Sequence, residues 1–193
     1  MLELGTSAPD FSLPEVGNQR TVDFHDFDSQ KALLVIFLCA HCPYVVHVQP
    51  ELARLTHDYS GKGVGIVGIT SNDVSQYPQD SPEQTVEMAK NAGLTFPILY
   101  DESQTVAMAY KAACTPDFFL FDASRRLVYR GQLDGSRPGR GVDRPAAGIP
   151  NGADLRAAIE ATLAGESVNA DQKPSIGCNV KWKRGNEPEY FAM

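Results

Sequence analysis

The amino-acid sequence predicts an α/β fold with a central mixed sheet flanked by helices. Two runs, residues 32–38 and 64–70, are apolar or glycine at almost every position, which is typical of strands covered on both faces. Between them, apolar residues recur every three or four positions from Pro43 onwards and predict a helix. A strand, a helix and a second strand of this kind form a right-handed unit with parallel strands. Two later runs, 117–121 and 127–132, flank a turn and predict an antiparallel pair.

The remaining elements follow from turn signals and helix-start signals. Pro43 suits the first turn of its helix, whereas Pro50 falls inside the helix and should kink it. The polar stretch 71–81 predicts a surface loop. The other expected elements are an N-terminal hairpin with strands at 10–13 and 21–24, a helix from Ser81 to about Asn91, a strand at 96–100, a helix at 104–111 and a final helix at 151–164.

The composition indicates one globular domain. A chain of 193 residues with 42% hydrophobic residues can bury a substantial core, and we expect a domain over residues 1–165 with a packed C-terminal tail over 166–193. The formal charge of −7 argues against nucleic acid and anionic membranes as partners. Glu3 stands where a secretory signal carries basic residues, and the longest apolar run, 32–40, is about half a membrane span. We therefore expect a cytoplasmic protein whose cysteines are largely reduced.

The sequence Cys39-Ala40-His41-Cys42 lies between the first apolar run and Pro43, where a strand passes into a helix. Two thiols at this spacing indicate a dithiol redox centre. The N–H groups and the positive dipole end of a helix N-terminus favour the thiolate, and an imidazolium at His41 would act in the same direction. We therefore expect the pKa of Cys39 to lie below that of a free cysteine, since the thiolate is the form that attacks disulfides.

Two structural interpretations compete with the redox centre. The two cysteines of this motif are half of a typical zinc site, which His47 and His57 could complete only from along one helix. A second pair at matching spacing is missing, because Cys114 and Cys178 stand alone. The two motif cysteines could also be unrelated core residues. We rank both interpretations below the redox centre and expect neither a metal nor a cofactor.

The order of the expected elements over residues 8–165 resembles the thioredoxin-like fold, in its redoxin and thiol-disulfide oxidoreductase branch. Four segments are more specifically similar to a group of bacterial thioredoxin-like proteins regarded as thiol-disulfide isomerases or thioredoxins. They are Cys-Ala-His-Cys-Pro-Tyr at 39–44, Ser71-Asn72-Asp73 followed by Tyr77-Pro78, Thr115-Pro116, and Gly-Cys-Asn-Val-Lys-Trp at 177–182. The resemblance implies a thiol-disulfide oxidoreductase acting on protein or small-molecule disulfides and dithiols, with an unidentified reductase or oxidant.

The resemblance also implies roles for single residues. Cys39 would be the exposed nucleophile and Cys42 the buried resolving thiol. Pro116 would be a cis-proline facing the pair, so that an extended substrate could pair with the backbone of Thr115. Two features depart from thioredoxins: Leu38 replaces the tryptophan before the first cysteine, and no acidic residue lies in 32–38. The proton of the second thiol must then leave through His41, His47 or water.

Two other functions share this fold. A peroxiredoxin-like peroxidase would use Cys42 as its peroxidatic thiol, but Val35 and Cys39 then occupy the proline and threonine positions of that motif. A non-enzymatic module for redox sensing or binding would hold a partner in the groove beside Pro116.

The tail carries an alternating pattern. Ile176, Cys178, Val180 and Trp182 alternate with glycine and polar residues, which predicts a strand with one buried face. We expect Ile176 and Trp182 to pack against the body of the protein and to bring Cys178 near the dithiol. There Cys178 is either a third redox thiol or a small apolar residue of the packed face.

Overall fold

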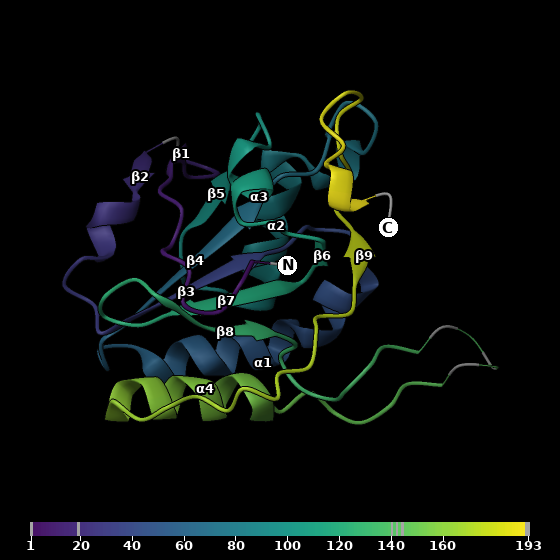
Figure 1. Ribbon diagram of the computed structural model, residues 1–193. Helices are drawn as coiled ribbons and strands as arrows, with labels where there is room; N and C mark the ends of the chain where they lie inside the picture. Colours follow the sequence, from purple (N-terminus) through teal and green to yellow (C-terminus); the bar gives the residue numbers. More distant parts are fainter. Residues whose placement is uncertain (1, 19, 140, 142, 144, 192–193) are drawn as a thin grey trace.

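Within the residues that the structure describes, 2–18, 20–139, 141, 143 and 145–191, the centre of the protein is a five-stranded mixed sheet (Figure 1). In this computed structural model, residue 1 of the expected domain and residues 192–193 of the expected tail lie outside the described part. The strand order is β5-β4-β3-β7-β8. The strands are β3 (Ala32–Phe37), β4 (Val64–Thr70), β5 (Ile98–Tyr100), β7 (Asp117–Phe121) and β8 (Leu127–Gly131). Because β3 pairs in parallel with β4 and antiparallel with β7, the predicted mixed sheet is confirmed.

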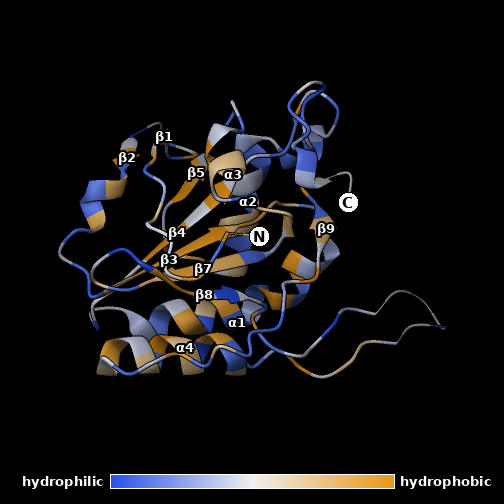
Figure 2. Cartoon of the chain, viewed as in Figure 1, coloured by the Kyte–Doolittle hydropathy of each residue, from blue (hydrophilic) through white to orange (hydrophobic). Residues whose placement is uncertain are grey.

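Strand β3 is buried on both faces, which explains its continuous apolar sequence. Leu34 and Ile36 belong to one core cluster, and Leu33, Val35 and Phe37 belong to a second cluster on the opposite face. Helices α1 and α4 cover the first face, and the N-terminal hairpin and α3 cover the second, so that the apolar strands lie between polar outer surfaces (Figures 1 and 2). These elements are β1 (Ser12–Pro14), β2 (Thr21–Asp23), α1 (Pro43–Tyr59), α2 (Pro82–Ala92), α3 (Thr105–Ala109) and α4 (Ala153–Ala164), with 3₁₀ turns at Phe24–Phe27, Pro78–Asp80 and Glu189–Phe191.

Helix α1 places the second motif cysteine at its N-terminus. Pro43 occupies the first turn as expected, and Cys42 is the N-cap residue. Further along, the buried Glu51 pairs with Arg54 at 2.6 Å and with Arg156 of α4 at 2.7 Å. A buried carboxylate requires such partners, so these contacts fix α4 against α1.

Helix α3 is shorter than the predicted helix at 104–111. Gln104, just before the helix, and Lys111, just after it, have φ angles of 65° and 52°. Both values lie in the left-handed region, which interrupts a right-handed helix. The local backbone therefore limits α3 to five residues.

The predicted surface loop at 71–81 is instead largely buried at both ends. Ser71, Asn72, Asp73 and Asp80 are each at most 5% exposed. Their side chains are paired within the protein: Ser71 donates to Asp101 at 3.0 Å, and Asn72 donates to Asp80 at 2.7 Å. Hydrogen bonds inside the protein replace those to water, so the polar sequence of this stretch does not mean that its ends are exposed.

The C-terminal tail runs from α4 along the body to a two-stranded sheet beside the central one (Figure 1). In this sheet β6 (Cys114–Thr115) pairs antiparallel with β9 (Cys178–Asn179). Trp182 is buried as expected. Ile176 is 51% exposed, which corrects the expectation that it packs against the body. Upstream of β9 the tail is held instead by polar contacts, among them the bond from Ser175 Oγ to the Gly131 carbonyl.

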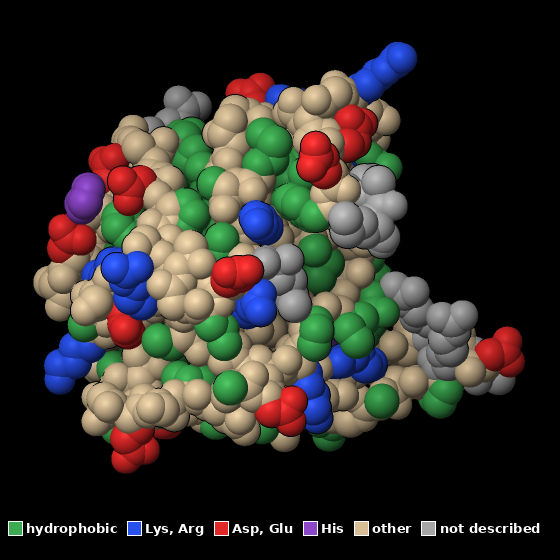
Figure 3. Space-filling model, in the orientation of Figure 1, with side chains coloured by type: hydrophobic (Ala, Val, Ile, Leu, Met, Phe, Trp, Pro, Cys, Tyr) green, Lys and Arg blue, Asp and Glu red, His purple; other side chains and the backbone are tan. Residues whose placement is uncertain are grey.

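The described part of the chain contains no helix that is both long enough and apolar enough to cross a membrane. On the face shown in Figure 3, acidic and basic side chains are interspersed.

Candidate active site

The two motif cysteines lie beneath the surface, where β3 passes into α1. Cys39 is 1% exposed and Cys42 is 0% exposed. The expected burial of Cys42 is confirmed, but the expected exposure of Cys39 is wrong. Thr115 contacts both sulfurs and Cys178 packs against the same core cluster, so β6 and the tail cover the pair.

The Cys39 and Cys42 thiols are hydrogen-bonded to each other. The bond from the Cys39 thiol lowers the pKa of Cys42 to about 4, because it stabilises the thiolate. The same bond raises the pKa of Cys39, and burial and the Asp80 carboxylate raise it further. The pair therefore loses its first proton readily and retains its second. This result corrects the expectation of a lowered pKa for Cys39, since the thiolate is favoured at Cys42, the N-cap residue of α1.

Thr115 lies against both sulfurs, and the bond that joins it to Pro116 is cis, as expected. Its hydroxyl oxygen lies 3.3 Å from Cys39 Sγ. When Cys42 is protonated, its thiol donates to the Thr115 carbonyl at 3.1 Å. A thiolate cannot donate a hydrogen bond. Once ionised, Cys42 therefore loses its bond to the Thr115 carbonyl and accepts the bond from the Cys39 thiol instead.

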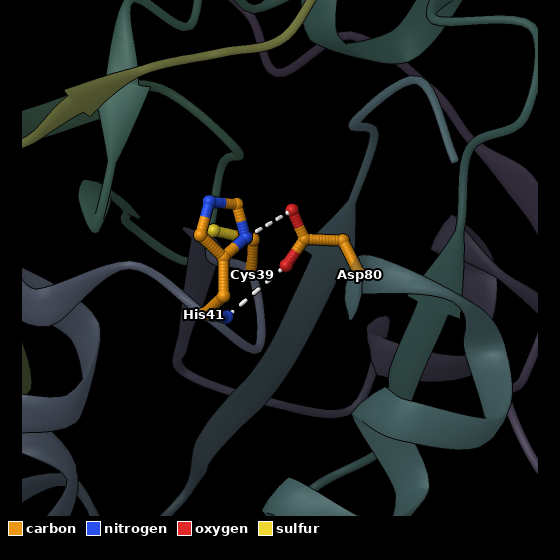
Figure 4. A group of neighbouring side chains, drawn as sticks. All are labelled: Cys39, His41 and Asp80. Atoms are coloured by element: carbon orange, nitrogen blue, oxygen red, sulfur yellow. Dashed lines mark hydrogen bonds and ion pairs between the residues drawn. The ribbon is translucent and has the colours of Figure 1, made fainter. Parts of the chain in front are cut away.

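His41 is paired with a carboxylate that the sequence did not single out. Asp80, which is fully buried, lies with Oδ2 2.6 Å from His41 Nδ1 and accepts a bond from the His41 backbone N–H at 3.1 Å. Figure 4 shows Cys39, His41 and Asp80 converging. A carboxylate therefore lies beside the motif although β3 contains none, and it comes from a residue 39 positions after His41. One sequence signal was available: the polar stretch follows β4, and the carboxyl ends of the parallel strands β3 and β4 lie at one edge of the sheet.

The same three side chains offer a set of metal ligands. One atom each from Cys39, His41 and Asp80 lie within 4.8 Å of one another. The zinc site that His47 and His57 would complete with the two motif cysteines is not formed. His47 Nε2 instead lies 3.0 Å from Ser136 Oγ, and His57 is in the last turn of α1. Within the described residues, the Cys39 sulfur, an imidazole and a carboxylate at this spacing are the group that could hold a cation such as zinc, with loss of the Cys39 proton.

The tail brings Cys178 to the dithiol, as expected. Thr115 and Cys178 are direct partners in the β6–β9 pairing. The side chain and the backbone N–H of Cys178 both hydrogen-bond to the Cys42 sulfur and help to lower its pKa. The contact is close because residue 177 is glycine: a Cβ there would lie 2.1 Å from the Thr115 carbonyl oxygen. Cys178 is half-buried.

Cys114, the residue before Thr115, is a buried thiol. It is 7% exposed, and its thiol contacts the Pro116 carbonyl at 3.7 Å. Burial raises its pKa. A buried, protonated thiol is a weak nucleophile, so Cys114 acts as a small apolar residue.

Comparison with known proteins identifies the family. The redoxin family model matches residues 3–147, and the chain belongs to this family. Two solved structures are similar over nearly the whole length. A hypothetical protein of Sinorhizobium meliloti 1021 is 47% identical, with 96% of this chain and 97% of that chain covered and a TM-score of 0.89. An uncharacterised conserved protein of Geobacillus kaustophilus is 51% identical, with 95% of this chain and 94% of that chain covered and a TM-score of 0.88.

Curated relatives are more distant. The thiol-disulfide oxidoreductase ResA of Halalkalibacterium halodurans is 25% identical over 64% of this chain and 65% of its own length. A protein of Mycobacterium tuberculosis, provisionally named a peroxiredoxin, is 26% identical over 56% of this chain and 63% of its own. The chain thus spans just under two thirds of the length of these relatives. A protein of Chlorobium tepidum, provisionally named a thiol:disulfide interchange protein, shares the thioredoxin-like fold. It has 18% identity, with 84% of this chain and 99% of that one covered and a TM-score of 0.65.

Proposed function

We propose that this protein is a thiol-disulfide oxidoreductase that exchanges disulfides through Cys39 and Cys42. The observation that carries the proposal is that both sulfurs lie against one residue, the Cys39 sulfur 3.3 Å from the Thr115 hydroxyl and the Cys42 sulfur 3.1 Å from the Thr115 carbonyl, and share a hydrogen bond. Two sulfurs this close can form a disulfide with little movement, and a thiolate at Cys42 is the nucleophile that exchange requires. The ResA relatives and the redoxin family support an oxidoreductase.

His41 and Asp80 serve in this proposal as the proton route of the pair. Cys39 retains its proton in the reduced pair and must lose it when the disulfide forms. Ligand atoms of both residues lie within 4.8 Å of the Cys39 sulfur, and the imidazole is about a third exposed. His41 can therefore carry a proton between Cys39 and solvent while Asp80 holds the ring in place.

A redox titration tests the proposed function directly. The reduced protein is equilibrated with mixtures of dithiothreitol and its oxidised form, and its disulfides are mapped by mass spectrometry. We expect a reversible Cys39–Cys42 disulfide, together with turnover in an insulin-reduction assay. The Cys39–Cys42 disulfide should be lost in Cys39→Ser and in Cys42→Ser, and insulin turnover should be lost when both cysteines are replaced by serine. The control Cys114→Ser should keep both properties. Insulin reduction that persists without either motif cysteine would overturn the proposal.

The peroxidase alternative is supported by the relative from Mycobacterium tuberculosis. It is tested by peroxide consumption with dithiothreitol as reductant, and faster turnover with peroxide than with disulfides would favour it. The binding-module alternative rests on a small groove that Tyr44, His47, Pro116 and Ile176 help to line. A partner retained by both Cys39→Ser and Cys42→Ser, without any disulfide, would favour that function.

A further inference from the structure

The C-terminal tail occupies the backbone edge at which an extended substrate is expected to pair. Thr115, the residue next to the cis-proline, is paired with Cys178 of the same chain. The pairing continues in the bond from Val180 N–H to the Ala113 carbonyl at 3.3 Å, and Gly177 lies directly on the Thr115 carbonyl. The protein therefore carries its own extended segment at this edge, with a cysteine opposite Thr115.

The four cysteines differ in how far the residue is buried. Cys39, Cys42 and Cys114 are buried, with exposed fractions of 1%, 0% and 7%, whereas Cys178 is half-buried. Exchange needs direct contact between the attacking and the attacked sulfur. Cys178 is therefore the most exposed of the four cysteines, whereas the motif cysteines are covered while the tail is in place.

We propose that Cys178 is a third redox thiol, which takes the disulfide of an external substrate and passes it to Cys42 and from there to Cys39. This inference rests on the proposed function, because Cys39 and Cys42 are its final acceptors. The disulfide passes from Cys178 to Cys42 and not directly to Cys39, because Cys178 is the direct strand partner of Thr115, whose carbonyl lies 3.1 Å from the Cys42 sulfur. The Cys178 thiol and backbone N–H are also hydrogen-bond partners of that sulfur.

The exchange balances in three steps. In the first step the Cys42 thiolate takes the proton of Cys178. The Cys178 thiolate attacks the external disulfide and forms a mixed disulfide with one half of it. The other half leaves as a thiolate and takes the proton from Cys42. The Cys42 thiolate then attacks the Cys178 sulfur, forms a Cys42–Cys178 disulfide and releases the second external thiolate. Cys39 loses its proton to that thiolate and attacks Cys42, which forms the Cys39–Cys42 disulfide and frees the Cys178 thiolate. One external disulfide is reduced to two thiols, and one dithiol is oxidised.

The first experiment measures the rate at which oxidised glutathione oxidises the reduced protein in a single turnover. We expect Cys178→Ser to slow the formation of the Cys39–Cys42 disulfide on the order of tenfold or more, because the accessible thiol is lost. The reduction potential should stay unchanged, since serine keeps a hydroxyl donor beside Cys42, and the control Cys114→Ser should react at the wild-type rate. A wild-type rate in Cys178→Ser would overturn the relay and leave the proposed function standing. A wild type that forms no Cys39–Cys42 disulfide would instead overturn the proposed function.

The second experiment traps the intermediate. In Cys39→Ser the last step is blocked, so a single turnover with oxidised glutathione should leave an intramolecular Cys42–Cys178 disulfide. Peptide mapping would detect it. Glutathione that remains attached to Cys42, with Cys178 reduced, would show that the substrate reaches the motif directly and would overturn the relay.

The third experiment separates a relay from a tail that merely blocks the site. Gly177→Ala places a Cβ 2.1 Å from the Thr115 carbonyl and should displace β9, whereas the control Gly135→Ala adds a Cβ in open space. With the tail displaced, transfer to Cys42 should slow and glutathione should accumulate on Cys178. Faster formation of the Cys39–Cys42 disulfide in Gly177→Ala would show that the tail only obstructs access, and would overturn the proposal.

Discussion

Asn72 donates a hydrogen bond from Nδ2 to Asp80 Oδ2 at 2.7 Å, and through this bond it joins the tail to the dithiol site. Its Oδ1 accepts a bond from the Lys181 backbone N–H at 2.9 Å. Asp80 in turn holds His41 beside Cys39. One buried amide therefore positions both the carboxylate of the site and the segment that carries Cys178.

Replacing Asn72 should disturb both of these contacts. We expect Asn72→Ala to lower the free energy of unfolding by about 1–3 kcal/mol, because it leaves buried groups without partners. Amide hydrogen exchange in β9 should accelerate, and the pH dependence of the dithiol should change. The control is Gln104→Ala, which removes bonds to Lys181 and Lys183 but none to Asp80. It should accelerate exchange in β9 without changing the titration of the dithiol. Equal effects of both variants on the titration would contradict a specific role for Asn72.

The reduction potential should depend weakly on pH. With the pKa of Cys42 at about 4 and that of Cys39 raised, the reduced pair holds one proton at neutral pH. Reduction then consumes one proton for two electrons, so the potential should fall by about 30 mV per pH unit, against about 60 mV for two protons. Equilibration with dithiothreitol at several pH values above 4 measures the slope. A slope of about 60 mV through neutral pH would mean that both thiols are protonated.

Removing the charge of Asp80 should make Cys39 easier to ionise. The Asp80 carboxylate is one cause of the raised pKa of Cys39, so Asp80→Asn should lower that pKa. Thiolate absorbance in the ultraviolet, followed to alkaline pH, would show the second thiolate at a lower pH than in the wild type. The control Asp73→Asn changes a buried carboxylate that is bonded to Ser75 and Gln76, and it should leave the titration unchanged. A second thiolate at the same or a higher pH in Asp80→Asn would contradict the electrostatic role of Asp80.

Asp117 should make the protein less stable as the pH rises. Burial raises its pKa to about 6 from the ordinary value of 3.8. A carboxyl with a raised pKa binds its proton more tightly in the folded state, so its contribution is fully present below about pH 4 and is lost towards pH 6. The loss amounts to about 3 kcal/mol. Urea unfolding at pH 4 and pH 7 should show this difference.

The matched variants for this prediction are Asp117→Asn and Asp171→Asn. In Asp117→Asn the amide cannot ionise but keeps an acceptor for the Ala113 N–H, so the difference in stability between pH 4 and pH 7 should shrink by about the same amount. Asp171 is exposed in the tail, and its replacement should leave the difference as in the wild type. A difference that persists in Asp117→Asn would place its origin in other groups.

The sequence predicted the elements that depend on local pattern. Strand β4 lies at the expected residues, and α1 begins at Pro43, because apolar periodicity and a proline in the first turn are local signals. Alternation in the tail correctly predicted that Trp182 is buried. It failed at Ile176, because the preceding segment is held by hydrogen bonds that leave no apolar pattern.

The candidate site could be predicted only in part. The motif located Cys39, His41 and Cys42, because their chemistry follows from spacing alone. Asp80 was missed, because its polar neighbours are typical of solvated loops and its partner Asn72 is brought to it by tertiary folding. The pKa directions of the two thiols could not be predicted either, since they depend on the hydrogen bond between the sulfurs and on the cover that the tail provides.

The short β6–β9 pairing also has a consequence for the protein at high concentration. Without β9, the backbone groups of β6 would form an open strand edge next to two cysteines, and a second molecule could pair with it. Any such association would bring thiols of two molecules together and favour intermolecular cross-links on oxidation. We therefore expect the tail to limit covalent aggregation, so that a C-terminally truncated form should be purified and stored under reducing conditions.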